Sequence, residues 1–294
     1  MSISLTKKIS ISKKKRPLII AEISGNHNGD KKSFLAHIKS AKKAGADLVK
    51  IQTYEPQDIT IKSYKKKFKI KDGIWKNKYL WELYKKAHTP FKWHYDAFKL
   101  ARKMNIPIFS SPFSERSLNF LSKFNPPIYK VASFEITDLN LIKNIAMKKK
   151  PIILSTGMND LKNIRDTVKV INKYNCPLAI LHCTSMYPTP YKKVRLGALK
   201  ILRKAFPYAV IGLSDHSMGI ETCLGAVSLG ASILEKHFTV NTKWSGPDNI
   251  ISITPSQLKR LKKESENIWE ALGGDLAILT EEKPVINFAY SSVT

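Results

Sequence analysis

The amino-acid sequence predicts an α/β fold: a (β/α)8 TIM barrel with a short N-terminal β-hairpin. Eight apolar runs, each too short to be a helix, end at polar residues, as the buried strands of a parallel sheet do. Helical patterns separate these runs, and the length of 294 residues suits one barrel domain. A doubly wound open sheet is the alternative, but no glycine-rich phosphate-binding motif follows the first run.

The predicted elements follow one another in a regular order. Residues 3–5 and 9–11 alternate apolar and polar side chains around a pair of lysines, which predicts a hairpin under the barrel. A polar turn at 24–30 leads into a helix that ends near Lys43. The eight predicted strands are 17–23, 48–53, 107–111, 128–133, 151–156, 178–184, 209–216 and 232–238, and two later helices are predicted at 220–229 and 255–272. The chain therefore divides into an extension (1–16), the barrel (17–280) and the start of a linker (281–294).

The net charge of +27 is high for a globular protein. It is compatible with a nucleic-acid partner, a membrane surface or an anionic substrate. Arginine, the better ligand for phosphates and base edges, is scarce, and the lysines form scattered runs without interleaved aromatic residues. We therefore expect no nucleic-acid partner and assign most lysines to solvated faces.

The cysteines and the N-terminus bear on the cellular compartment. Cys176, Cys183 and Cys223 are odd in number and lack metal or redox spacing, so we expect reduced thiols. Residues 1–16 are basic but contain no apolar core of a secretory signal. No apolar run is long enough to span a bilayer. The sequence thus predicts a cytoplasmic protein with no membrane partner.

Two histidines stand at the ends of successive predicted strands, the seventh and the eighth. Because side chains alternate along a strand, Ser214 shares a face with His216, and Glu235 shares a face with His237. Two imidazoles beside a hydroxyl and a carboxylate suit a divalent metal whose other positions are filled by water or substrate oxygen. A lone histidine is more often a packing residue, but two at successive strand ends favour chemistry.

Polar residues gather at the carboxyl ends of the predicted strands, the face on which barrel enzymes work. Besides the two histidines they are Glu22, Lys50, Gln52, Ser111, Lys130, Ser133, Glu135, Ser155, Ser185, Tyr187, Ser214 and Glu235. Some of these serines could instead cap the helices that follow. Capping does not explain Lys50 and Lys130, because a lysine buried in a barrel mouth is costly unless it meets an anion. The lysines and hydroxyls predict a pocket for a phosphate and a carboxylate.

One long connection, residues 54–77, interrupts the regular spacing. It is rich in lysine and contains Asp72-Gly73-Ile74-Trp75. A loop of this length over a barrel mouth is typically a lid or a specificity loop. A solvated lysine loop is the alternative.

Eight short motifs, in order along the chain, resemble the sialic acid synthase family. They are AEISGNHNG (21–29), VKIQT (49–53), SPF (111–113), YKVASFE (129–135), LSTGM (154–158), YPTP (187–190), GLSDHS (212–217) and EKHFT (235–239). The resemblance implies a (β/α)8 barrel that condenses phosphoenolpyruvate with an amino sugar to give a nonulosonic acid and phosphate. Residues 72–75 and 83–94 are similar to the pseudaminic acid synthase branch, which implies a 2,4-diacetamido-2,4,6-trideoxy hexose as the sugar.

The resemblance also implies roles for individual residues. Phosphoenolpyruvate would be bound by Lys50, Ser111, Lys130, Ser133, Ser155, Ser185 and Ser214. A divalent metal, manganese in this family, would be bound by His216 and His237, and the sugar would be lined by Glu22, Gln52, Glu135, Tyr187 and Asp248. In the resulting mechanism His216, His237, Glu22 and Glu135 are the catalytic residues. At Ser111 and Ser185 the sialic acid branch has threonine and asparagine instead.

The sequence departs from the family pattern at its C-terminus. The family continues into a small antifreeze-like domain that covers the partner subunit's active site and supplies an arginine to the sugar. Here the resemblance ends at 284–294, so we expect either a homodimer or a separate chain that supplies the lid domain. Three functions stay open: pseudaminic acid synthesis, sialic or legionaminic acid synthesis from another hexosamine, and a non-catalytic relative that keeps the phosphoenolpyruvate pocket.

Overall fold

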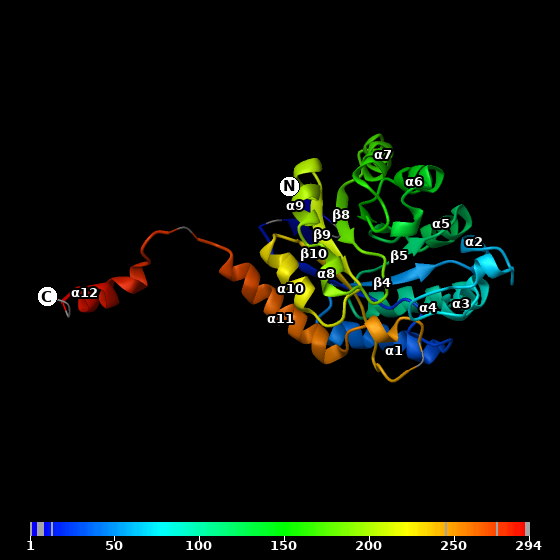
Figure 1. Cartoon of the computed structure of the whole chain (residues 1–294), viewed down its shortest axis with the longest axis horizontal. Helices are drawn as coiled ribbons and strands as arrows, with labels where there is room; N and C mark the ends of the chain where they lie inside the picture. The colour runs from blue at the N-terminus through cyan, green and yellow to red at the C-terminus, as the bar shows by residue number, and fades with distance from the viewer. Residues whose placement is uncertain (1, 5–8, 13, 245, 275, 292–294) are drawn as a thin grey trace.

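Eight parallel strands close into a barrel in the order β10-β3-β4-β5-β6-β7-β8-β9 in the computed structural model of the protein, which describes all residues except 1, 5–8, 13, 245, 275 and 292–294 (Figure 1). The strands are β3 (Leu18–Glu22), β4 (Leu48–Thr53), β5 (Ile108–Pro112), β6 (Tyr129–Val131), β7 (Ile152–Ser155), β8 (Leu178–Cys183), β9 (Val210–Asp215) and β10 (Ile233–His237). Each strand begins within one residue of the start that the sequence predicted. The predicted (β/α)8 barrel is confirmed.

Helices surround the barrel on its outside. They are α1 (Lys31–Lys43), α4 (Phe91–Lys103), α5 (Glu115–Ser122), α6 (Leu139–Ala146), α7 (Leu161–Asn172), α9 (Ala198–Ala205), α10 (Glu221–Ser228) and α11 (Pro255–Ala271), with the short helices α2 (Pro56–Ile59), α3 (Leu80–Ala87) and α8 (Tyr191–Val194) in connections. Local interactions between neighbouring residues determine where several of these helices begin. Thr254 and Gln257 form a capping box at α11, with Pro255 in the first turn, where a missing N–H costs nothing.

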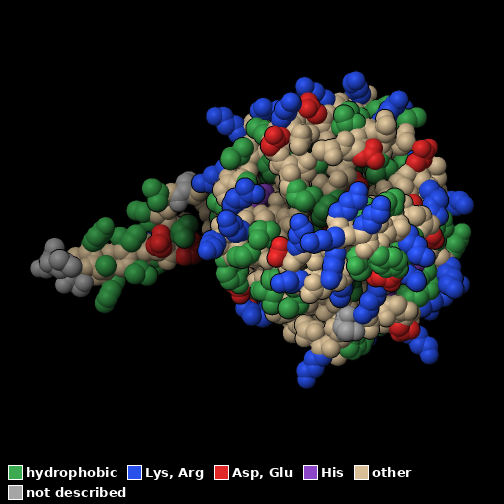
Figure 2. Space-filling view, turned by 45° about the vertical axis from the view of Figure 1, so that its right-hand side comes forward, with side chains coloured by type: hydrophobic (Ala, Val, Ile, Leu, Met, Phe, Trp, Pro, Cys, Tyr) green, Lys and Arg blue, Asp and Glu red, His purple; other side chains and the backbone are tan. Residues whose placement is uncertain are grey.

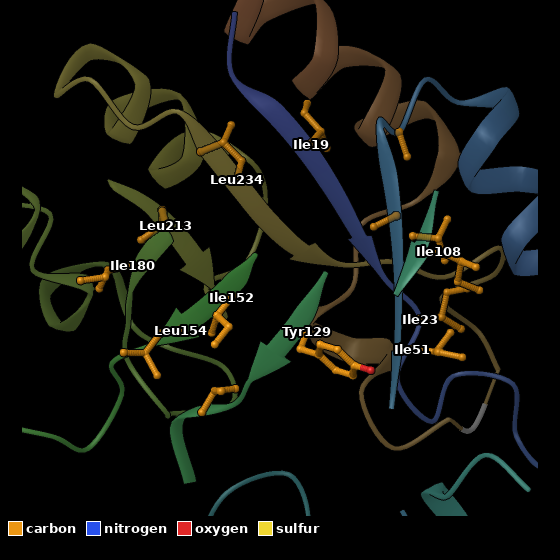
Figure 3. Packing of buried hydrophobic residues seen from close by; sticks show 14 of the residues in the cluster. Ile19, Ile23, Ile51, Ile108, Tyr129, Ile152, Leu154, Ile180, Leu213 and Leu234 are labelled. Carbon is orange, nitrogen blue, oxygen red and sulfur yellow. The ribbon is translucent and has the colours of Figure 1, made fainter. Parts of the chain in front are cut away.

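The buried apolar residues form two clusters, one on each side of the barrel wall. Figure 3 shows the outer cluster, in which outward side chains such as Ile19, Ile51 and Leu234 pack between strands and helices. The inner cluster contains the first residues of several strands, including Leu18 and Leu48. This alternation is why the strands read as continuous apolar runs.

The N-terminal hairpin closes the lower end of the barrel. Its strands are β1 (Ser2–Ser4) and β2 (Ser10–Ser12), and they pair antiparallel with Ile3 opposite Ile11. Both isoleucines are buried in the inner cluster, beside the first residues of the barrel strands. The hairpin prediction is confirmed, although each strand is shifted by one residue and 5–8 lie outside the described residues.

Beyond α11 the chain leaves the barrel. A segment with the exposed Leu276 and Ile278 leads to α12 (Lys283–Ser291), which stands away from the barrel in Figure 1. The sequence predicts a linker here and does not predict this helix. Lysine and arginine side chains are spread over the face in Figure 2 and do not form one stripe, as expected for solvated charge. Among the described residues, no helix is long and apolar enough to cross a membrane.

Candidate active site

A cavity of about 160 Å³ opens at the carboxyl ends of the strands. The predicted site residues that line it are Lys50, Gln52, Lys130, Ser133, Glu135, Ser155, Tyr187, Ser214, His216, His237 and Asp248. The other three, Glu22, Ser111 and Ser185, are not among its lining residues, although Glu22 contacts Lys50 and Gln52, and Ser185 lies near Ser133 at Gly157. Closure of the barrel thus brings together side chains as far apart in the sequence as Glu22 and Asp248, because they lie on the parallel strands or in the connections that follow them.

Lys50 on β4 lies between two buried carboxylates. Its Nζ is 3.1 Å from Glu22 Oε2 and 3.0 Å from Glu235 Oε1. Burial lowers the pKa of the Lys50 ammonium, but the two carboxylates outweigh burial and raise the pKa above its usual value. The charge of Lys50 is therefore compensated by the protein itself, and its ammonium is held in a fixed position.

Lys130 on β6 is the contrasting case. It is 1% exposed, and its Nζ donates hydrogen bonds to Ser155 Oγ at 2.6 Å and to the carbonyl oxygen of Val131 at 3.0 Å. No carboxylate oxygen of the described residues forms an ion pair with it. Burial lowers its pKa to about 8. The charge of Glu235 acts on the Lys130 ammonium without forming an ion pair with it. A buried ammonium that no carboxylate contacts is costly, so this end of the cavity favours an anion.

Hydroxyl groups surround the space next to Lys130. Ser133 Oγ accepts a hydrogen bond from the Gly157 N–H at 2.9 Å, and Asn159 Nδ2 donates to the carbonyl oxygen of Gly157 at 2.6 Å. The hydroxyl oxygens of Ser111 and Ser185 are buried without a hydrogen-bond partner among the described residues. Buried polar groups are rarely left unpaired. The Ser185 hydroxyl lies near that of Ser133 at Gly157, so these two hydroxyls can serve the oxygen atoms of one bound anion.

Gly157 provides a test of this hydroxyl cluster. A Cβ at this position would collide with the hydroxyl oxygens of Ser133 and Ser185. We expect Gly157→Ala to raise the KM for an anionic substrate about tenfold, the equivalent of about one lost hydrogen bond to a charged group. The matched control is Gly197→Ala, because nothing lies within 4 Å of a Cβ there. Steady-state kinetics that change equally in both variants would contradict the expectation.

The rings of His216 and His237 are neighbours in the lining of the cavity. Their ring centroids are 5.3 Å apart. His216 Nδ1 donates to the carbonyl oxygen of Thr184 at 2.9 Å, which leaves its Nε2 free to act as a ligand. His237 Nδ1 is buried, has no hydrogen-bond partner in the described part of the chain, and lies 3.9 Å from Asp248 Oδ2. Burial lowers the pKa of His237 well below its usual value and keeps the ring neutral, as a metal ligand must be.

These donors suit a divalent metal that takes only part of its coordination shell from the protein. Within the described ranges there is no group of three or more His, Cys, Asp or Glu side chains arranged to hold a metal ion. A metal at His216 and His237 would therefore complete its shell with water or substrate oxygen, as a catalytic metal with open positions does. The unpartnered nitrogen of His237 is the observation that fits this arrangement.

Two further acids have raised pKa values. Burial raises the pKa of Glu135 to about 7, and its Oε2 has no hydrogen-bond partner among the described residues. Burial also raises the pKa of Glu22 to about 7, although Lys50 opposes this shift. Glu22 accepts a hydrogen bond from Gln52 Nε2 at 3.0 Å. Carboxyl groups that titrate near neutrality can gain or lose a proton during a reaction.

The structure adds residues that the sequence analysis did not assign to the site. The sequence places Glu235 beside His237 as a carboxylate of the catalytic face but assigns it no catalytic or substrate-binding role, and the structure shows that it accepts hydrogen bonds from both Lys50 and Ser214 Oγ. The alternation along β10 was the signal that could have assigned it. The aromatic side chains of Tyr54, Trp75, Tyr84 and Phe113 also line the cavity. They come from separate elements, so no local pattern marks them.

Comparison with known proteins identifies the family. A model described as the NeuB family matches residues 37–276, most of the chain. The chain belongs to the NeuB family. The resemblance to the sialic acid synthase family is thereby confirmed.

Individual relatives of this NeuB family member support the assignment. It is 40% identical to a pseudaminic acid synthase from Campylobacter jejuni over 94% of this chain and 80% of the relative. It is 38% identical to an N,N'-diacetyllegionaminic acid synthase from the same species over 92% and 82% of the two chains. The structure is similar to the crystal structure of N-acetylneuraminic acid synthetase from Leptospira borgpetersenii in complex with citrate, with a TM-score of 0.87, 32% identity and coverage of 99% and 97%.

Proposed function

We propose that this protein condenses phosphoenolpyruvate with a 2,4-diacetamido-2,4,6-trideoxy hexose to give a nonulosonic acid and phosphate, as a pseudaminic acid synthase. One observation carries the proposal. The ammonium of Lys130, which forms no ion pair among the described residues, lies with its hydroxyl cluster in the same cavity as two imidazoles that can hold a metal. An acidic phosphate ester and an aldehyde could therefore lie side by side.

The residues of this chain would hold phosphoenolpyruvate at the charged end of the cavity. Lys130 and the hydroxyls of Ser133, Ser155 and Ser185 would bind one anionic group, and Lys50 with Ser214 would bind the other. A divalent metal, proposed to be Mn²⁺ and held by His216 and His237, would supply a Lewis acid to the aldehyde oxygen. Carbon C3 then forms a bond to the aldehyde carbon, and the aldehyde oxygen takes up a proton to become a hydroxyl.

The second half of the reaction removes phosphate. Positive charge develops at C2 when C3 attacks, and the carboxylate of Glu135 or Glu22 would stabilise it. A water adds to C2 and gives its proton to one of these carboxylates. The tetrahedral product breaks its C2–O bond, which releases phosphate with the bridging oxygen and leaves a ketone. A bridging oxygen label should therefore appear in the phosphate, and its retention in the sugar acid would exclude this route.

The pH dependence follows from Lys130. Because its pKa is lowered to about 8, the ammonium is present below this pH and is lost as the pH rises through it. We expect kcat/KM for phosphoenolpyruvate to fall about tenfold per pH unit above about pH 8, since this quantity reports the free enzyme. Lys130→Arg keeps its charge at every accessible pH, so its kcat/KM should not show this decrease above about pH 8. A wild-type profile that stays level to pH 10 would contradict the assignment.

The function is tested by the mass of the product. The full chain is incubated with phosphoenolpyruvate, Mn²⁺ and each of three sugars: the 2,4-diacetamido-trideoxy hexose of the pseudaminic route, its legionaminic stereoisomer and N-acetylmannosamine. We expect a nonulosonic acid from the first. The 38% identity to a legionaminic acid synthase makes the second the main alternative. Phosphate release no greater than that of His216→Ala with every sugar would indicate a non-catalytic relative.

A further inference from the structure

The cavity is lined by aromatic and aliphatic side chains as well as by charged ones. The former are Tyr54, Ile59, Trp75, Leu83, Tyr84 and Phe113, which we call the aromatic box. We propose that the aromatic box binds the apolar substituents of the acceptor sugar, its methyl and acetamido groups, and that Trp75 is the residue that determines this specificity. The inference rests on the proposed function and names the residue that selects the sugar.

Ring contacts build the box from distant elements. Tyr54 follows β4 and packs edge-to-face against Tyr84 of α3 at 5.9 Å between centroids, and against Phe113 after β5 at 5.1 Å. Trp75 lines the same cavity, and its ring centroid lies 5.0 Å from that of Tyr187. Tyr187 in turn lies 4.2 Å from the ring of His216. A sugar in the box would thus be adjacent to the pair of histidines.

The long connection places Trp75 over the cavity. The indole N–H of Trp75 donates a hydrogen bond of 2.8 Å to the carbonyl oxygen of Pro247. A bridge between Lys69 and Tyr79 closes the base of this segment. The residue after Pro247 is Asp248, which lines the cavity and accepts a hydrogen bond from Ser24 Oγ. The connection is therefore fixed across the mouth, which supports its interpretation as a lid.

Trp75 also separates the catalytic cavity from a second depression on the surface. It lines the catalytic cavity, and it lines a second surface depression formed with Lys78, Met218 and Ile250. Removal of the indole would join the box to this outer depression. Water would then reach the sugar side of the cavity, and the burial of apolar groups there would be lost.

The chemistry of the box selects its ligand. A sugar hydroxyl that faces Ile59 or Leu83 would lose its hydrogen bonds to water without replacement, whereas a methyl group gains from burial. A planar acetamido group can pack against the aromatic faces. Burial raises the pKa of Tyr84 to about 12, so its hydroxyl remains a donor for an acetamido oxygen. These features favour a 6-deoxy, acetamido-substituted hexose over a hydroxylated one.

The test compares two acceptors in the full-length protein. At saturating phosphoenolpyruvate and Mn²⁺, kcat/KM is measured for the 2,4-diacetamido-trideoxy hexose and for N-acetylmannosamine. We expect Trp75→Ala to lower the ratio of the two values by about 10- to 100-fold, the range for one or two apolar contacts. Trp75→Phe, which keeps an aromatic ring, should lower it by less than about fivefold. The calorimetric affinity for phosphoenolpyruvate should not change.

Trp81 of α3 provides the control, because it lies near the lid in sequence but does not line the cavity. Trp81→Phe should leave the ratio unchanged. If Trp75→Ala lowered kcat/KM equally for both sugars, or weakened the affinity for phosphoenolpyruvate, Trp75 would only position the lid. Either result would overturn the inference. Wild-type protein that turns over neither sugar would overturn the proposed function and this inference with it. Wild-type turnover with an unchanged ratio in Trp75→Ala would overturn this inference alone.

Discussion

Lys130→Met is expected to weaken the binding of phosphoenolpyruvate by at least about 100-fold without destabilising the protein, since the loss of a buried charge contact costs several kcal/mol of binding. Lys130 forms no ion pair among the described residues, so its removal breaks none, and the nearby Glu235 carboxylate keeps its ion pair with Lys50. Methionine has a similar volume and fills the space with an apolar chain. Calorimetry should show the lost affinity, and thermal unfolding should show an unchanged or raised Tm.

Lys236 is the matched control, because it is equally buried but paired. Its Nζ lies 2.6 Å from Asp215 Oδ2, on the outer side of the barrel wall between β9 and β10. Lys236→Met leaves the Asp215 carboxylate buried and uncompensated, and should lower the free energy of unfolding by about 3–5 kcal/mol. Affinity for phosphoenolpyruvate should persist. Equal destabilisation by both substitutions, or retained affinity in Lys130→Met, would refute the assignment of Lys130 to the anion.

His216→Ala is expected to lower kcat by about 10³-fold while phosphoenolpyruvate still binds, because several kcal/mol of charge stabilisation at the aldehyde would be lost. His237→Ala should behave in the same way, since both imidazoles line one wall. Removal of divalent metal from the wild-type protein with a chelator should reproduce this loss, and added Mn²⁺ should restore turnover. The chelator should cause little further loss in either variant.

His88 supplies the control for the histidine substitutions. It lies at the end of α3, donates through Nδ1 to the carbonyl oxygen of Lys85, and does not line the cavity. His88→Ala should keep wild-type kcat and wild-type sensitivity to the chelator. A His216→Ala variant within threefold of wild type, or wild-type turnover that survives complete removal of metal, would exclude the proposed role of the pair.

Local patterns predicted the barrel because the sequence of each strand is by itself typical of a buried parallel strand. A run such as 48–53 is short, apolar and followed by polar residues, and β4 has the same bounds. The end of each strand also marks the catalytic face, so the cluster of Lys50, Lys130, His216 and His237 was accessible from the sequence. Helix α12 (Lys283–Ser291) was missed, because none of its residues is buried against the barrel and the interpretation of this segment as a linker relied on resemblance alone.

The sequence alone determined which residue types lie at the strand ends, since the alternation of side chains along a strand and the end of its apolar run depend on a few neighbouring residues. Only the tertiary structure decided which of these charges are paired. Lys50 and Lys130 look alike in the sequence, yet the first lies between Glu22 and Glu235, whereas the second forms no ion pair with a carboxylate of the described residues. Likewise, nothing near Trp75 in the chain shows that it contacts Tyr187 and Pro247. Such contacts join distant segments, and they depend on the register and closure of the whole barrel, which no local pattern encodes.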